Sequence, residues 1–149
     1  YGYDHFVCDT SGSLCEVVDP WDPNDAIMTD LASATLPVWI RGTEADLEEL
    51  VSRFERAPKP MYYPQAFLAD VWAAYLSDRG LAAADVDPDD FIRHGFRALM
   101  LHRLPRYAAM AERWGISLDA AEVAQVQHPS ELDALIEDRL GQRSAALSV

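Results

Sequence analysis

Basic side chains are scarce in this sequence. Its 149 residues include 12 lysine and arginine side chains against 25 aspartate and glutamate side chains, which gives a formal net charge of −13. This excess of negative charge would repel nucleic-acid phosphates and anionic lipid surfaces. In addition, no apolar run approaches the roughly 20 residues that a membrane-spanning helix needs. We therefore expect no nucleic acid and no membrane among the partners.

Several sequence signals of known chemistry are also missing. The two cysteines, Cys8 and Cys15, form no CxxC pair, and Cys8 lies in an apolar run. This pattern favours buried free thiols and a cytoplasmic protein. No two histidines are four residues apart, so a zinc site is not expected. The sequence contains no glycine-rich P-loop motif, dinucleotide fingerprint or nucleophile elbow.

Half of the residues are apolar, and their spacing predicts an α/β fold. Short apolar runs predict buried strands over residues 3–9 and 37–40. Capping residues and helical spacing predict helices over the ranges 26–35, 43–56, 65–79, 87–114 with an interruption at Pro105, 119–123 and 130–140. An extended segment is expected at 116–118. We predict one domain over residues 1–149, with a strand, helix and lid-like part (1–64) and a mostly helical part (65–149).

The first candidate site follows the predicted N-terminal strand. Asp9 would lie at the carboxyl end of that strand, where ligands gather in open α/β sheets, and could hold Mg²⁺. Thr10, Ser11 and Ser13 surround Gly12, which would let the backbone approach a phosphate. The structural alternative is that Asp9 and Ser11 only cap a turn.

The second and third candidates are groups of cations. Arg53 and Arg56 lie three residues apart at a predicted helix end and lead to Lys59, the one lysine, between two prolines. They could face a phosphate or simply complement the helix dipole. The third group could clamp a carboxylate or phosphate, or pair with the protein's own acids; its members are Arg93, Arg97, His102, Arg103, Arg106 and Arg113.

Two stretches together resemble the P-loop kinases of the shikimate-kinase type. The first runs from a strand into a helix and then to a lid-like segment: Leu36-Pro37-Val38-Trp39-Ile40, Glu44, Leu47, Leu50, Arg53 and Lys59-Pro60-Met61. The second resembles that family's Arg-x-Pro-x-Tyr-x-x-x-Ala helix, and it is Arg103-Leu104-Pro105-Arg106-Tyr107-Ala108-Ala109-Met110-Ala111. The whole chain, including residues 9–16, also resembles small alphaproteobacterial proteins described as ATPases.

The resemblance implies a partial parallel sheet of a P-loop NTPase-like domain with an enlarged helical C-terminal half. It implies an ATP-dependent phosphotransferase or ATPase that acts on a small acidic molecule, with ATP and Mg²⁺ as cofactors. Asp9 would assist the metal, Lys59 would contact phosphate from the lid, and Arg103 would bind the acceptor. Arg97 and Arg106 would join Arg103 at the acceptor, while Thr10, Ser11, Ser13, Arg53 and Arg56 would contact nucleotide.

The missing P-loop leaves other functions open. We expect the loop to come from a preceding segment, because two strands alone make a poor sheet. The main alternative is a non-catalytic acidic interaction module that docks a protein partner or a second copy through its arginines and aromatic residues such as Tyr62 and Tyr63. A domain that binds a small molecule without turnover is the third possibility.

Overall fold

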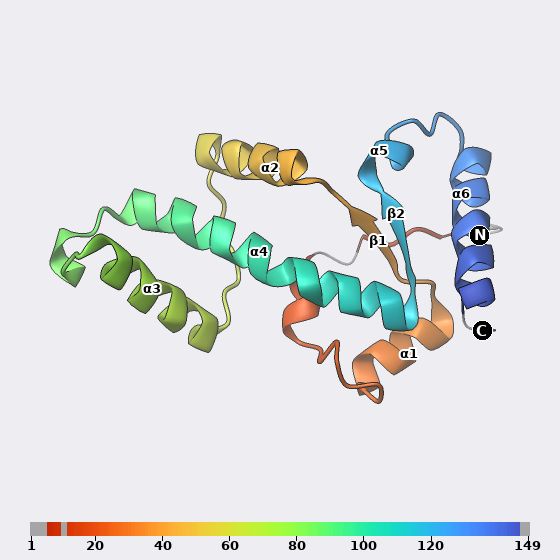
Figure 1. The fold of residues 1–149 in the computed structure, drawn as a ribbon, viewed down its shortest axis with the longest axis horizontal. Helices are drawn as coiled ribbons and strands as arrows, with labels where there is room; N and C mark the ends of the chain where they lie inside the picture. Colours follow the sequence, from red (N-terminus) through yellow and green to blue (C-terminus); the bar gives the residue numbers. More distant parts are fainter. Residues whose placement is uncertain (1–5, 10–11, 147–149) are drawn as a thin grey trace.

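The computed structural model describes residues 6–9 and 12–146, which are mostly helical around a small two-stranded parallel sheet. This confirms the α/β class. Figure 1 shows a long helix, α4, with α2 and α3 beside its first half and the sheet near its C-terminal end. The elements in chain order are η1 (Gly12–Glu16), α1 (Ala26–Ala34), β1 (Val38–Arg41), α2 (Glu44–Arg56), α3 (Gln65–Arg79), η2 (Ala83–Asp85), α4 (Pro88–Trp114), β2 (Ile116–Asp119), α5 (Ala120–Val123) and α6 (Pro129–Ala146).

The sheet joins two segments that are far apart in the sequence. β1 and β2 run parallel in the register that pairs Val38 with Ile116 and Arg41 with Asp119. Gly115 makes this close approach possible, because a Cβ atom at this position would overlap the carbonyl oxygen of Pro37. That oxygen accepts a hydrogen bond from the Ile116 amide at 3.0 Å. The extended segment expected at 116–118 is thus the partner strand of β1.

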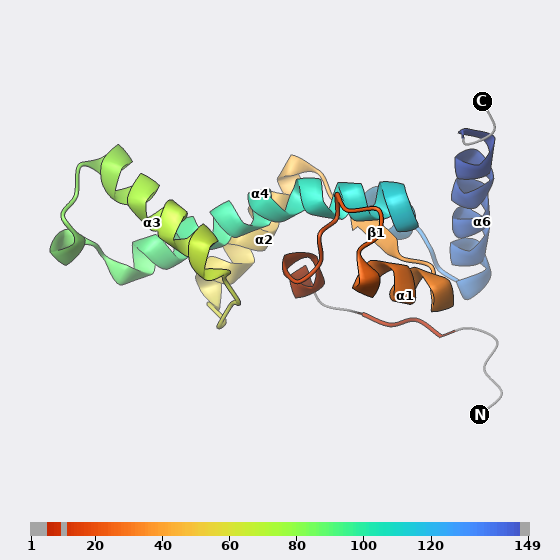
Figure 2. The ribbon, with the colours of Figure 1, turned by 90° about the horizontal axis from the view of Figure 1, so that it is seen from below.

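The predicted N-terminal strand is wrong over its described part. Phe6, Val7, Cys8 and Asp9 form no strand, and Phe6 and Val7 are 86% and 83% exposed. Cys8 is exposed rather than buried, whereas Cys15 is buried as predicted. The views in Figures 1 and 2 place α4 on one side of the sheet and this segment on the other. Apolar residues alone did not make a strand here, since a strand needs a neighbouring strand to satisfy its backbone groups.

Local capping signals position most helices as predicted. The Asp25 carboxylate accepts a hydrogen bond from the Met28 amide at the start of α1, and Asp87 caps α4 in the same way. Thr43 and Asp46 form a capping box at the start of α2. Gly80, with φ of 62°, ends α3 in the left-handed conformation that glycine adopts easily.

Helix α4 continues through Pro105, so the predicted interruption is wrong. Proline removes one hydrogen bond, here the bond to the carbonyl of Leu101. Both residues are exposed, and Leu101 retains 47% of its accessible surface, so water can satisfy that carbonyl. Helix α6 also differs from prediction, because it begins at Pro129 rather than after Ser130 and extends to Ala146.

The apolar core lies where α2 packs on α4. Leu47, Val51 and Phe54 of α2 meet Phe96 of α4, and the rings of Phe54 and Phe96 stack with centroids 4.0 Å apart. Leu50 of the same helix lies outside this core and is 45% exposed. Within the described residues, no helix combines the length and the apolar character that crossing a membrane requires.

Candidate functional site

Arg103 lies at the junction of three chain segments. Its side chain is 4% exposed, and its Nε donates to Oε1 of Glu16 at 2.8 Å, whose side chain is 2% exposed. One terminal nitrogen reaches the carbonyl oxygen of Tyr62 in the segment between α2 and α3, at 3.5 Å. Nε2 of His102 lies 3.5 Å from Oε2 of Glu16. The guanidinium therefore ties α4 both to η1 and to the lid-like segment.

Arg106 and Tyr107 fasten the same N-terminal segment to α4. Arg106 donates from Nε to the carbonyl of Cys15 at 2.7 Å and from a terminal nitrogen to that of Val18 at 2.9 Å. Its guanidinium also lies 5.1 Å from the ring centroid of Trp21. The Tyr107 hydroxyl donates to the carbonyl of Gly12 at 2.9 Å. Arg106 and Tyr107 thus hold three backbone carbonyl groups of this segment, those of residues 12, 15 and 18.

Burial controls the titration of the two weak acids in this cluster. Desolvation, together with the neighbouring Cys15, raises the pKa of Tyr107 to about 12. Desolvation, and then the charge of Glu16, also raise the pKa of the Cys15 thiol. Both groups therefore keep their protons at neutral pH, where a reactive cysteine would need a lowered pKa. The cluster positions the chain rather than supplying a nucleophile.

The other arginine candidates lie elsewhere. Arg97 forms an ion pair with Glu48 of α2 at 2.6 Å, and Arg56 pairs with Glu49 in its own helix at 3.2 Å. Arg53 is exposed on α2. Arg97 and Arg103 thus follow the structural alternative, pairing with the protein's own acids. Lys59 does not join them, and it lines an apolar cavity beside Phe54 and Met61.

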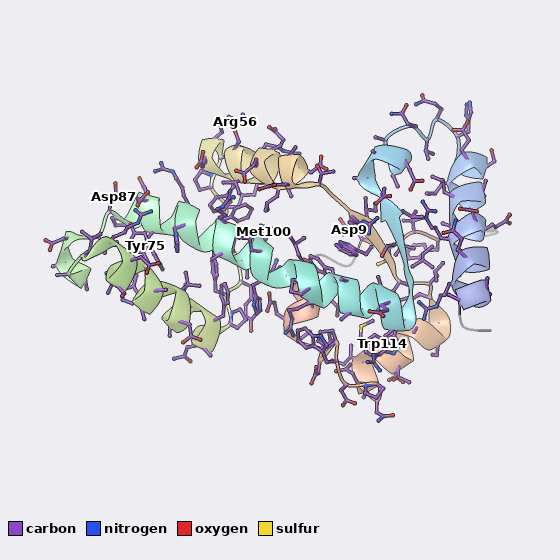
Figure 3. All side chains as sticks on the ribbon, viewed as in Figure 1. Asp9, Arg56, Tyr75, Asp87, Met100 and Trp114 are labelled. Carbon is purple, nitrogen blue, oxygen red and sulfur yellow. The ribbon has the colours of Figure 1, made fainter. Side chains whose placement is uncertain are left out.

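Asp9 remains apart from the lid-like cations. It lies in the exposed segment before η1, and Figure 3 shows it well separated from Arg56 at the far end of α2. Ser13 is half-buried in η1, while Thr10 and Ser11 lie outside the described residues. Among the described residues, no group of three or more His, Cys, Asp or Glu side chains could hold a metal ion. A magnesium ion at Asp9 would thus need further ligands, such as phosphate oxygens and water.

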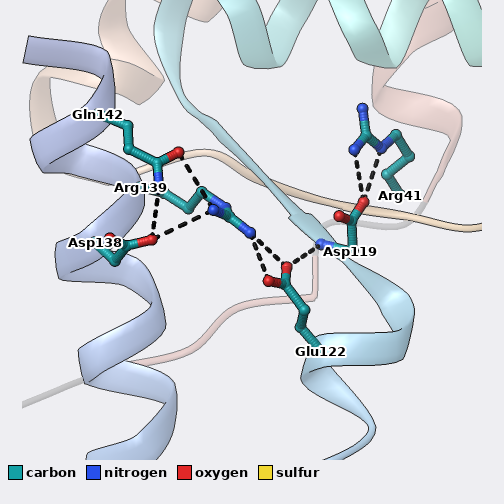
Figure 4. A network of polar contacts seen from close by, with 6 residues as sticks. All are labelled: Arg41, Asp119, Glu122, Asp138, Arg139 and Gln142. Atoms are coloured by element: carbon teal, nitrogen blue, oxygen red, sulfur yellow. Dashed lines mark hydrogen bonds and ion pairs between the residues drawn. The ribbon is translucent and has the colours of Figure 1, made fainter. Parts of the chain in front are cut away.

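A polar network at the carboxyl ends of both strands was missed by the sequence analysis (Figure 4). Arg41 ends β1 and pairs with Asp119, which ends β2, at 2.7 Å. Glu122 accepts two hydrogen bonds from Arg139 of α6, at 2.6 and 2.7 Å, and these lower the pKa of its carboxyl group. The capping box of Asp119 and Glu122 was predicted, but nothing near them in sequence indicates Arg139.

A groove of about 400 Å³ lies between the sheet, α4 and α6. Its lining includes Trp39, Ser117, Arg139 and Arg143. The guanidinium of Arg143 is already committed, because it donates to the carbonyls of Ala111, Glu112, Arg113 and Gly115 at the end of α4. Arg143 therefore has a structural role, because it joins α6 to the C-terminal end of α4.

No family model, no curated protein and no solved structure matches this chain.

Proposed function

We propose that this chain is the C-terminal part of an ATP-dependent phosphotransferase or ATPase that acts on a small acidic molecule, with the P-loop supplied by a segment outside this sequence. The parallel pairing of β1 with β2 is the observation that supports this most directly. Between the two strands, the chain forms α2, a proline-interrupted segment and the helix with Arg103, Pro105 and Tyr107. This order of elements is the one that the resemblance to P-loop kinases predicts.

The exposed face of β1 is evidence for a further strand and helix in the complete protein. Trp39 faces α4, since its ring centroid lies 6.3 Å from that of Tyr107. Side chains alternate along a strand, so Val38 and Ile40 point to the other face, where they are 40% and 53% exposed. Parallel strands are normally covered on both faces. A strand, glycine-rich loop and helix would add a neighbour at the edge of β1 and a cover for the open face.

The described residues do not themselves fit a bound nucleotide. A P-loop binds phosphates through consecutive backbone amides, and the sequence has no such glycine-rich loop. Asp9 would add one carboxylate to a metal site completed elsewhere, and Arg53, Arg56 and Lys59 would supply positive charge from the lid. Arg103 and Arg106 take a positioning role here, because their donors are engaged by Glu16, Tyr62, Cys15 and Val18.

Calorimetric titration of Mg·ATP and Mg·ADP into this chain, and into the product of its complete reading frame, tests the proposal. We expect binding and ATP turnover from the longer protein only. In that protein, Asp9→Asn should lower turnover about 10- to 100-fold, as expected for loss of a charge that acts at the reacting phosphate. Asp30→Asn, an exposed acid on α1, is the matched control.

Two results would contradict the proposal. Tight nucleotide binding by this chain alone would mean that the phosphates lie at a different place. No binding by either protein would favour the non-catalytic interaction module, which docks a partner through its arginines and aromatic residues such as Tyr62 and Tyr63.

A further inference from the structure

A second cavity lies away from the sheet, where four segments meet. It measures about 270 Å³ and is enclosed by α2, the segment between α2 and α3, the start of α3, and the first half of α4. Its lining residues are Phe54, Lys59, Pro60, Met61, Tyr63, Leu68, Phe91, Ile92 and Gly95. This volume is just below the range of pockets for drug-sized ligands and suits a smaller molecule.

Gly95 contributes to the space in this cavity. It is a buried residue in the interior of α4, where alanine would be the better helix former. A Cβ atom at this position would meet the hydroxyl of Tyr63 at 3.8 Å and a ring carbon at 3.9 Å, which are ordinary contacts. Close packing of the helix therefore does not require glycine here. The effect of the missing side chain is a larger cavity.

The walls favour a flat apolar group. Phe54, Tyr63 and Phe91 supply aromatic rings, and Phe54 is held in place by its stack on Phe96. Aromatic rings prefer offset or edge contacts with other rings, which this arrangement can provide from several directions. Met61 adds a flexible thioether that adapts to the shape of a bound group.

Two features of the lining favour a negative charge on that ligand. Lys59, the single lysine of the sequence, is an exposed residue at this mostly apolar cavity, and it forms no ion pair within the part of the chain that the structure describes. Helix α3 begins beside the cavity, since Leu68 of its first turn is a lining residue. Its N-cap Pro64 makes no side-chain hydrogen bond, and no acid lies in its first turn, so the positive end of the helix is uncompensated.

We propose that this cavity binds a small aromatic monoanion, with the ring between α2 and α4 and the carboxylate at Lys59. Glycine at position 95, the aromatic walls and the single cation together define this ligand class. The proposal does not need a P-loop, but it gives Lys59 a carboxylate partner in place of the nucleotide phosphate proposed above.

Phenylacetate and its neutral analogue phenylacetamide are suitable probes, measured by protein-observed NMR and calorimetry on the full chain. We expect phenylacetate to bind with a dissociation constant of about 0.1–1 mM, in line with its few atoms. Phenylacetamide should bind about 3- to 10-fold more weakly. Lys59→Gln should remove that difference by weakening phenylacetate alone, because only the acid gains from the ammonium group.

Gly95→Leu should fill the cavity and weaken both probes at least ~10-fold. Gly141→Leu is the matched control, because Gly141 is also in a helix but has open space around it. Retained binding in Gly95→Leu would overturn the location, and equal binding of acid and amide in the unmodified chain would overturn the charge selection. Lack of binding by either probe would overturn the proposal as a whole. Because Lys59 is exposed, its variant keeps the charge test valid if Gly95→Leu folds poorly.

Discussion

The two strands of the sheet carry aliphatic residues at the same two register positions but have very different surroundings. Ile116 and Leu118 of β2 are 5% and 1% exposed, whereas their register partners Val38 and Ile40 of β1 are 40% and 53% exposed. β2 is contacted by α4, α5 and α6 as well as by β1. β1 is contacted by α4 on its Trp39 face and also by α5, but Val38 and Ile40 on the other face stay partly exposed. β2 is therefore the strand that the other elements of this chain cover more fully.

The largest expected effect is the difference in stability between matched truncations in the two strands. Leu118→Ala should lower the free energy of unfolding by about 2–5 kcal/mol, because it leaves a void in a fully buried site. Ile40→Ala should lower it by less than about 1 kcal/mol, because half of that side chain already contacts water. Urea denaturation of both variants measures the two values.

Equal losses of stability for the two variants would contradict this difference between the strands, since Ile40 would then be covered in solution, for instance by a second copy. A larger loss of stability for Ile40→Ala in the complete reading-frame product than in this chain would support the difference. That result would show that another segment covers the open face of β1.

Local signals in the sequence were enough to place most helices. Asp25, Thr43 and Asp87 cap helices that begin where the sequence predicts them, because a cap depends only on the next three residues. The end of α3 at Gly80 was predictable for the same reason. The break at Pro105 was wrong because one lost hydrogen bond on an exposed side of a long helix can be replaced by water.

Contacts between distant residues were not predictable in this way. The strand over residues 3–9 was predicted from apolar residues alone, and no strand forms at 6–9. The partner of Arg103 is Glu16, 87 positions away, and the partner of Glu122 is Arg139 in another helix. The arginine group was recognised as a candidate for internal pairing, but its partners depend on how η1 and α2 pack on α4. The cavity at Gly95 likewise forms only when four segments meet.

An intermediate effect concerns the covered face of β1. Tyr107 lies between Trp39 and the carbonyl of Gly12, and its pKa is raised to about 12. Because the folded pKa exceeds the unfolded value near 10, the folded state holds this proton more tightly. Its stabilising effect is complete below pH 10 and is lost as the pH rises towards 12. We expect a loss of about 1 kcal/mol from this residue, after discounting for partial exposure.

Thermal unfolding of the unmodified chain and of Tyr107→Phe from pH 9 to 12 measures this contribution. Burial also raises the pKa of Cys15 and Tyr63, so both proteins should lose stability, and the unmodified chain should lose more. Tyr62→Phe, at a 57% exposed tyrosine, serves as control. Parallel pH profiles for the unmodified chain and Tyr107→Phe would mean that water reaches Tyr107 and that α4 does not seal this face.

The smallest expected effect is at the carboxyl ends of the two strands, where Arg41 and Asp119 form an ion pair whose side chains are 56% and 42% exposed. Arg41→Ala should lower the free energy of unfolding by about 0.2–1 kcal/mol at low salt, and less at high salt, as for other exposed pairs. Arg56→Ala breaks a pair of similar exposure within α2 and gives the reference value. A loss above about 2 kcal/mol for Arg41→Ala would mean that this end of the sheet is shielded from water in solution. β1 and β2 end together here. A similar small loss of stability for both variants would show that this carboxyl edge of the sheet is open to solvent, and so accessible to a further strand or a ligand.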